Sequence, residues 1–135
     1  MKSIFAAVLG FLLLGFWPAA HAAPSAIAVD EISYLLTYID HSGCQFYRNG
    51  DWYDSHRAQL HLRNKYDYLV ARDRIQSADD FIEQAASTSS MSGKEYQIQC
   101  EGGPAITSNS WLRSALIAYR ATAAQGATNK TSPTK

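Results

Sequence analysis

Residues 42–53 read Ser-Gly-Cys-Gln-Phe-Tyr-Arg-Asn-Gly-Asp-Trp-Tyr, and this segment predicts a β-hairpin. Its two aromatic-rich runs flank Asn49-Gly50, a residue pair that readily adopts the positive φ angles of a two-residue type I′ turn. Such a turn sets three cross-strand pairs: Arg48 with Asp51, Tyr47 with Trp52, and Phe46 with Tyr53. Because side chains alternate along a strand, Tyr47 and Trp52 should form an aromatic pair on one face.

A second strand-like run lies at Glu95-Tyr96-Gln97-Ile98-Gln99-Cys100. Its alternation is typical of a half-buried strand and places Tyr96, Ile98 and Cys100 on one face. In the hairpin, the same period places Cys44, Phe46 and Arg48 on one face. Both segments therefore carry a cysteine on the face that also carries apolar side chains, which suits a bridge between Cys44 and Cys100.

The first 22 residues have the three parts of a secretory signal peptide. Lys2 supplies the positive charge, residues 4–17 form an apolar run, and Ala20-His21-Ala22 is a small-x-small cleavage site. The apolar run is shorter than the ~20 residues needed to cross a bilayer, so we expect a removed signal and no membrane anchor. We expect a periplasmic or secreted protein, cleaved near Ala22.

The two cysteines of such an exported chain can form one intramolecular disulfide, Cys44–Cys100. We expect a structural bridge, to which the chain-entropy relation assigns about 4 kcal/mol for a loop of this length. A redox-active pair would normally show Cys-x-x-Cys spacing, which is absent.

Charge gives little indication of a partner. Without residues 1–22 the chain has eleven Lys and Arg against twelve Asp and Glu, a formal charge of −1. A nearly neutral chain gives no reason to expect nucleic acid or an acidic membrane as a partner.

Four segments show the apolar spacing of amphipathic helices, at about residues 27–41, 55–70, 77–87 and 108–121. Asp54 or Ser55 can cap the second, Ser77 opens an acidic variant of the capping box in the third, and Ser108 or Ser110 can cap the last. From residue 122 the apolar stripe is missing, so we expect a disordered tail over 122–135. The remainder, residues 23–121, predicts one α+β domain: about four helices packed on a short three-stranded sheet (hairpin plus one strand), with one disulfide.

Four sequence blocks are distinctive: Phe46-Tyr47-Arg48-Asn49-Gly50; Ala58 with His61-Leu62 and Lys65-Tyr66; Ser77-Ala78 with Phe81-Ile82; and the serine-rich run from Ala86 to Tyr96. In these blocks the chain resembles the YfeK-like family of small exported bacterial proteins, a domain of unknown function. The resemblance covers nearly the whole mature chain, from the first helix to Tyr119-Arg120. It implies bacterial export and a shared small fold, and it brings no established activity, cofactor or catalytic residue.

The serine-rich loop, residues 87–94, is the first candidate site. The hydroxyls of Ser89 and Ser92 and the ammonium of Lys94 could cradle a phosphate or carboxylate. The loop departs from a P-loop, because Thr88 stands at the first glycine and Glu95 at the final hydroxyl position. The alternative is turn and helix-capping chemistry.

The second candidate is a basic stripe on successive turns of the predicted second helix: Arg57, His61, Lys65, Tyr68 and Arg72. It could meet an anionic small ligand or an acidic surface of an envelope protein, with His61 titrating near neutral pH. The alternative is an ordinary solvated face whose long stems cover apolar surface.

The hairpin supplies the third candidate, Arg48 with Trp52. Turn geometry accounts for Asn49-Gly50, and a weak cross-strand pair with Asp51 accounts for Arg48. The functional alternative is that Arg48 and Trp52 project together as an arginine–aromatic contact of the kind that dominates binding hot spots.

Catalytic and metal patterns are poorer, because the chain contains neither His-Glu-x-x-His nor Gly-x-Ser-x-Gly. We therefore predict a non-enzymatic binding or protein-interaction module without a cofactor or metal. Its candidate binding residues are Arg48, Trp52, His61, Lys65, Ser89, Ser92 and Lys94. One alternative is a small serine/histidine hydrolase in which His61 meets Ser89 or Ser92, and another is a structural envelope protein without a pocket.

Overall fold

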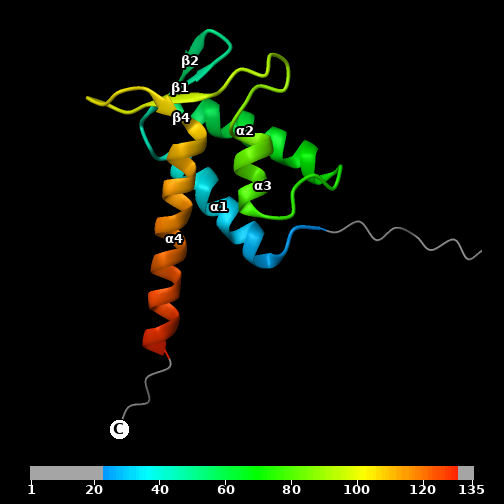
Figure 1. Cartoon of the computed structure of the whole chain (residues 1–135), viewed down its shortest axis with the longest axis vertical. Coiled ribbons are helices and arrows are strands. Elements are labelled where there is room, and N and C mark those ends of the chain that lie inside the picture. Colours follow the sequence, from blue (N-terminus) through cyan, green and yellow to red (C-terminus); the bar gives the residue numbers. More distant parts are fainter. Residues whose placement is uncertain (1–22, 131–135) are drawn as a thin grey trace, which may run out of the picture.

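The computed structural model describes residues 23–130, and its elements are those of the predicted α+β class (Figure 1). The helices are α1 (Ala26–Asp40), α2 (Ser55–Val70), α3 (Ala78–Asp80) and α4 (Ser108–Lys130), and α3 continues directly into a π-helical turn, η1 (Phe81–Ala85). The strands are β1 (Gln45–Arg48), β2 (Asp51–Tyr53), β3 (Gln97–Gln99) and β4 (Ile106–Thr107). The predicted signal peptide, residues 1–22, lies outside the described residues.

The hairpin has the predicted register, and it forms one half of an antiparallel sheet with the strand order β2-β1-β3-β4. Asn49 and Gly50 have φ angles of 52° and 101°, as a type I′ turn requires. Phe46 pairs with Tyr53 on one side and with Ile98 on the other. The sheet therefore presents Phe46 and Ile98 to the helices, where both are buried.

The sheet has one strand more than predicted. β4 pairs with β3 through Ile98 with Ile106 and Gln97 with Thr107. We predicted no strand at these positions, because two residues are too few to display a period of two. The extra strand brings the first residue of α4, Ser108, to the level of β3.

The predicted disulfide is present between Cys44 and Cys100, with an S–S distance of 1.99 Å. It joins residues 56 positions apart and ties the start of β1 to the end of β3. Cys44 is buried and belongs to the hydrophobic core. The strand alternation had placed both cysteines on the apolar face of the sheet, in agreement with this position.

Side-chain caps mark where the helices begin. Asp54, one of the two predicted alternatives, caps α2 by accepting the amide of Arg57, and Ser77 caps α3 in a capping box. For α4, both predicted caps are replaced by Thr107, whose Oγ1 accepts the Ser110 amide at 3.3 Å. The hydroxyl of Ser108 is therefore not needed for capping.

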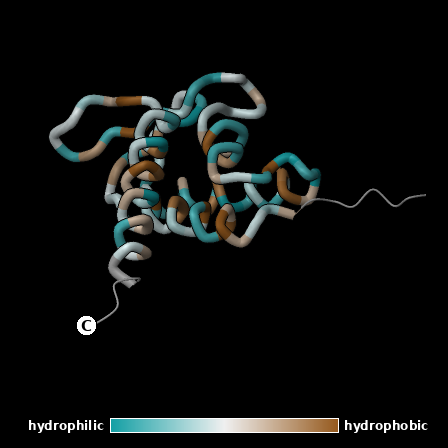
Figure 2. Tube along the Cα trace, turned by 60° about the horizontal axis from the view of Figure 1, so that its bottom comes forward, coloured by the Kyte–Doolittle hydropathy of each residue, from teal (hydrophilic) through white to brown (hydrophobic). Residues whose placement is uncertain are grey.

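Helix α4 is longer than predicted and ends at Lys130, whereas we expected a disordered tail from residue 122. Residues 122–128 are exposed, and the last helical turns before the C-terminus carry no strongly hydrophobic segment (Figure 2). Ala123, Ala124 and Ala127 have high helix propensity, and the helix continues here without burying side chains of residues 122–128. The end of α4 extends past the other helices (Figure 1).

A network of ion pairs, here called the ionic seam, joins α1, α3 and α4. Arg120 holds Glu31 through two bonds of 2.7 and 2.8 Å and reaches Asp79 at 3.0 Å. Arg113 contacts Asp79 at 3.2 Å and Glu83 at 3.0 Å. Every charge of the seam thus faces an opposite charge, and Glu31 is only 8% exposed.

Candidate functional site

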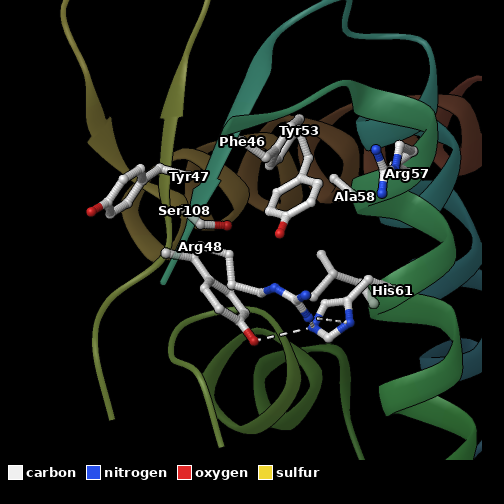
Figure 3. Close-up of a pocket in the computed structure, with 10 residues that line it drawn as sticks. Phe46, Tyr47, Arg48, Tyr53, Arg57, Ala58, His61 and Ser108 are labelled. Carbon is white, nitrogen blue, oxygen red and sulfur yellow. Dashed lines mark hydrogen bonds between the residues drawn. The ribbon is translucent and has the colours of Figure 1, made fainter. Parts of the chain in front are cut away.

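A cavity of about 170 Å³ lies between the hairpin, α2 and the start of α4 (Figure 3). Its floor and walls are buried side chains: Phe46, Ala58, Leu62, Tyr96 and Ser108. Its mouth is formed by side chains that are half-buried or exposed, namely Arg48, Tyr53, Arg57 and His61, while the ring of Tyr47, which also lines the cavity, is directed away from it (Figure 3). The lining is therefore apolar at depth and cationic at the opening.

Arg48 is oriented into this cavity and not toward its cross-strand neighbour. It pairs with Asp51 in the strand register, as predicted, but its Nη1 lies 2.8 Å from Nδ1 and 3.0 Å from Nε2 of His61. Arg48 shares the inward face of β1 with Phe46, which directs it toward α2. The predicted side-chain pairing of Arg48 with Asp51 is thus replaced by a contact with His61.

His61 is a neutral imidazole at physiological pH. Burial, and then the nearby charges of Arg48 and Lys65, lower its pKa from 6.5 to about 4. A neutral ring offers one acceptor nitrogen to the Arg48 guanidinium, and Nε2 also lies 3.2 Å from the Tyr96 hydroxyl. Arg48, His61 and Tyr96 therefore form a connected polar group along one wall.

Arg48 and Arg57 both lie against the ring of Tyr53. Their guanidinium carbons are 5.3 and 5.2 Å from its centroid, within the range of cation–π attraction. None of the ion pairs among the described residues involves Arg48 or Arg57. The two guanidinium groups at the mouth are therefore stabilised by an aromatic face and leave their positive charge unneutralised.

Lys65 adds a third cation behind this wall. Its Nζ donates to the Thr88 carbonyl at 2.6 Å and lies 5.2 Å from the centroid of Tyr96. Burial and the charge of Arg48 lower the pKa of Lys65 from 10.5 to about 8. Lys65 forms no ion pair among the residues of the structure and contributes positive potential without lining the cavity.

Ser108 is the site residue that sequence reasoning interpreted only as a helix cap. Its side chain is 1% exposed, and its Oγ has no hydrogen-bond partner within the described part of the chain. Figure 3 shows the hydroxyl directed toward the space between Tyr53 and the Arg48 side chain. A buried hydroxyl without a partner is costly, which makes it a position where a ligand atom would be favoured.

The serine-rich loop is attached to the hairpin turn through Asn49. The Asn49 amide nitrogen donates to Ser89 Oγ at 3.1 Å, and Ser92 Oγ donates to the Asn49 carbonyl oxygen at 2.6 Å. Ser89 is buried and also accepts the amides of Met91 and Ser92. Both predicted loop serines thus hold the turn in place, and Asn49, which we assigned to turn geometry alone, is their shared partner.

Of the predicted site residues, Arg48 and His61 line the cavity, and Trp52 and Lys94 lie outside it, as Lys65, Ser89 and Ser92 do. Trp52 packs on Tyr47 with ring centroids 5.3 Å apart, the aromatic pair that the register predicted, while Arg48 points to the opposite face. The proposed joint contact of Arg48 and Trp52 is therefore not formed. Lys94 is exposed and does not line the cavity.

The arrangement does not assemble the predicted hydrolase centre. His61 is bonded to Arg48 and Tyr96, whereas Ser89 and Ser92 are bonded to Asn49, so no hydrogen bond among the described residues joins either serine to His61. A serine nucleophile needs a base within hydrogen-bond reach. What the site presents instead is a mostly apolar cavity with Arg48 and Arg57 at its mouth.

Within residues 23–130, no group of three or more His, Cys, Asp or Glu side chains is placed to hold a metal ion. In the same range no helix combines the length and the apolar character needed to cross a membrane.

Comparison with known proteins points to relatives without an assigned activity. The model of a family of unknown function, DUF5329, matches residues 27–120. A protein named Uncharacterized protein YfeK, from Salmonella typhimurium strain LT2, is 37% identical over 97 residues, which make up 71% of this chain and 77% of that protein. No solved structure matches the chain.

Proposed function

The chain belongs to the DUF5329 family, as its resemblance to YfeK-like proteins predicted, and we propose that it is an exported, non-enzymatic binding module for a small anionic ligand. The ligand site is the cavity between the hairpin, α2 and the start of α4. The family carries no activity over to this chain, so the proposal stands on the geometry of the cavity.

One observation carries the proposal: Arg48 and Arg57 flank the mouth of an apolar cavity without a carboxylate partner. Guanidinium groups form strong charge-assisted hydrogen bonds to carboxylates and phosphates, and low-dielectric walls strengthen such bonds. Most ligand sites combine apolar walls with a small number of placed polar groups, which describes this lining.

The arginine side chains at the mouth of the cavity are already held in place without a bound anion. The Tyr53 ring holds both guanidinium groups near the mouth, so less side-chain freedom is lost on binding. Neutral His61 adds no charge of its own, and it occupies only part of the hydrogen-bonding capacity of Arg48, whose guanidinium has five N–H donors.

Export is the second part of the proposal. It is supported by the signal-like pattern of residues 1–22 and by the disulfide, which is typical of oxidising compartments. In a bacterial host, N-terminal sequencing of the protein recovered from the periplasmic fraction should begin at Ala23. Recovery of a chain that retains residues 1–22 in the cytoplasm would contradict this part.

The binding proposal is tested by an NMR titration of residues 23–135 with sodium acetate, inorganic phosphate, benzoate and AMP. At least one of these anions should produce saturable shifts at the cavity residues. The variant Arg48→Gln should weaken that binding at least tenfold, because a charge-assisted hydrogen bond contributes roughly 1.5–3 kcal/mol.

Arg72→Gln is the matched control. Arg72 also lies over a tyrosine, with its guanidinium carbon 3.5 Å from the Tyr68 ring centroid, but it does not line the cavity. Binding should be unchanged in this variant. The proposal is wrong if none of the four anions shifts the cavity residues, or if Arg72→Gln weakens binding as much as Arg48→Gln.

A further inference from the structure

We infer that the ligand is a small aromatic carboxylate that carries a second polar group opposite its carboxylate, as 4-hydroxybenzoate does. The inference rests on the proposed function and names its ligand class. Three properties of the cavity lead to it: its volume, its aromatic walls, and the separation of its polar groups into a cationic mouth and, at depth, the hydroxyl of Ser108, which has no partner among the described residues.

The cavity has room for about one ring. An apolar protein cavity of about 150 Å³ accommodates benzene, and the cavity here measures about 170 Å³. A six-membered ring with two small substituents fits this space, with the charged substituent in the opening. A nucleotide or a disaccharide would leave most of its surface outside the cavity.

The walls favour a flat apolar body. Phe46, Tyr53 and Tyr96 surround the space, and Leu62 closes it from α2. Aromatic side chains interact with an aromatic ligand through offset or edge-to-face contacts beyond simple area burial. Phe46, Leu62 and Tyr96 are all at most 6% exposed, so this part of the site is mostly apolar and lies below the protein surface.

The two ends of the cavity differ in the group they recognise. At the mouth, Arg48 and Arg57 provide several N–H donors for a carboxylate. At the floor, Ser108 provides one hydroxyl and no charge, and its own backbone amide is already bonded to the Tyr96 carbonyl at 2.9 Å. The floor therefore suits a neutral phenol or carbonyl oxygen, and a second anion there would lack a countercharge.

Calorimetric titration of residues 23–135 with four ligands tests the recognition of the carboxylate and the recognition of the second polar group. Benzoate should bind at least tenfold more tightly than benzamide, its neutral isostere, because only benzoate offers an anion to Arg48 and Arg57. 4-Hydroxybenzoate should bind about fivefold more tightly than 4-methylbenzoate, because only the hydroxyl can pair with Ser108. These two comparisons need no variant protein.

A cycle between protein and ligand locates the second effect at Ser108. In Ser108→Ala, the advantage of 4-hydroxybenzoate over 4-methylbenzoate should disappear. In Arg48→Gln, the advantage of benzoate over benzamide should fall at least tenfold, and in Arg72→Gln both ratios should remain unchanged.

The outcomes separate the inference from the proposed function. Binding of phosphate, acetate or AMP at the cavity without binding of the aromatic acids would overturn the inference and leave the proposed function intact. Equal affinities for benzoate and benzamide, or an advantage of 4-hydroxybenzoate that persists in Ser108→Ala, would also overturn it. Failure of every anion at the cavity would overturn both.

Discussion

Arginine side chains have different partners in the ionic seam and at the cavity. In the seam, Arg113 and Arg120 are surrounded by three carboxylates, and each guanidinium contacts two of them. At the cavity, Arg48 and Arg57 lie against an aromatic ring, and no carboxylate of the described residues forms an ion pair with them. The same residue type therefore closes a helix interface in one region and leaves a cationic opening in the other.

This difference separates a structural role from a binding role. Around an ion-paired arginine the net charge is close to zero, so a further anion is attracted only weakly. Around an arginine that lies on a tyrosine ring the net charge stays positive, so an anion is attracted more strongly. Substitutions in the seam should therefore act on stability, and substitutions at the cavity should act on binding. Four measurements test this division.

The largest effect is expected from removing the disulfide, which secures the hairpin side of the cavity. In the variant with Cys44→Ala and Cys100→Ala, the free energy of unfolding should fall by about 4 kcal/mol, because a long loop is released in the unfolded chain. Urea denaturation measures the loss. A decrease of less than about 1 kcal/mol would show that the sheet and helices hold the hairpin without the bridge.

A smaller loss is expected in the seam. Glu31→Gln removes a nearly buried charge and leaves Arg120 with Asp79 alone, which should lower the free energy of unfolding by about 2 kcal/mol, between the values for exposed and buried pairs. Arg48→Gln is the comparison variant and should change it by less than about 0.5 kcal/mol. Equal losses in the two variants would remove the distinction between seam and cavity.

Ser108→Ala should change stability in the opposite direction. Because the buried hydroxyl has no partner in the described structure, its removal should raise the free energy of unfolding by about 1 kcal/mol. Thermal denaturation of the ligand-free protein measures the effect. A destabilised variant would show that the hydroxyl serves the fold and not a ligand.

The smallest effect is the pH dependence contributed by His61. Its pKa is about 4 in the folded protein and 6.5 when exposed, so the unfolded chain binds more protons between these values. The free energy of unfolding should therefore fall as the pH is lowered from 6.5 to 4, by at most about 1 kcal/mol for this half-buried group. His61→Asn should show a flatter profile over that range, and an identical slope would contradict the assignment.

The strand geometry could be predicted from sequence because it depends on local rules. Asn49-Gly50 fixed the turn, and the alternation on both sides of it gave the pairing of Phe46 with Tyr53 and the common face of the two cysteines. Helix positions followed in the same way from apolar spacing. The two-residue strand β4 and the alanine-rich end of α4 show no such period, and both differ from expectation.

The candidate site was only partly predictable, because it depends on packing between distant segments. Arg48 and His61 were both singled out, but their contact follows from the docking of α2 on the hairpin, which no local pattern encodes. Ser108 was interpreted as a cap because a serine at the start of a helix usually caps it. In the structure, Thr107 at the end of β4 accepts the Ser110 amide instead. An unpartnered hydroxyl can be recognised only after the positions of its neighbours are known.

Asn49 has a consequence for how relatives of this chain should vary. Its backbone needs a positive φ angle, and its amide both donates to Ser89 and accepts from Ser92. Aspartate could keep the turn but could not donate, and glycine could keep the turn but could do neither. Position 49 should therefore co-vary with positions 89 and 92: a relative that replaces this asparagine should also have rebuilt the distant loop.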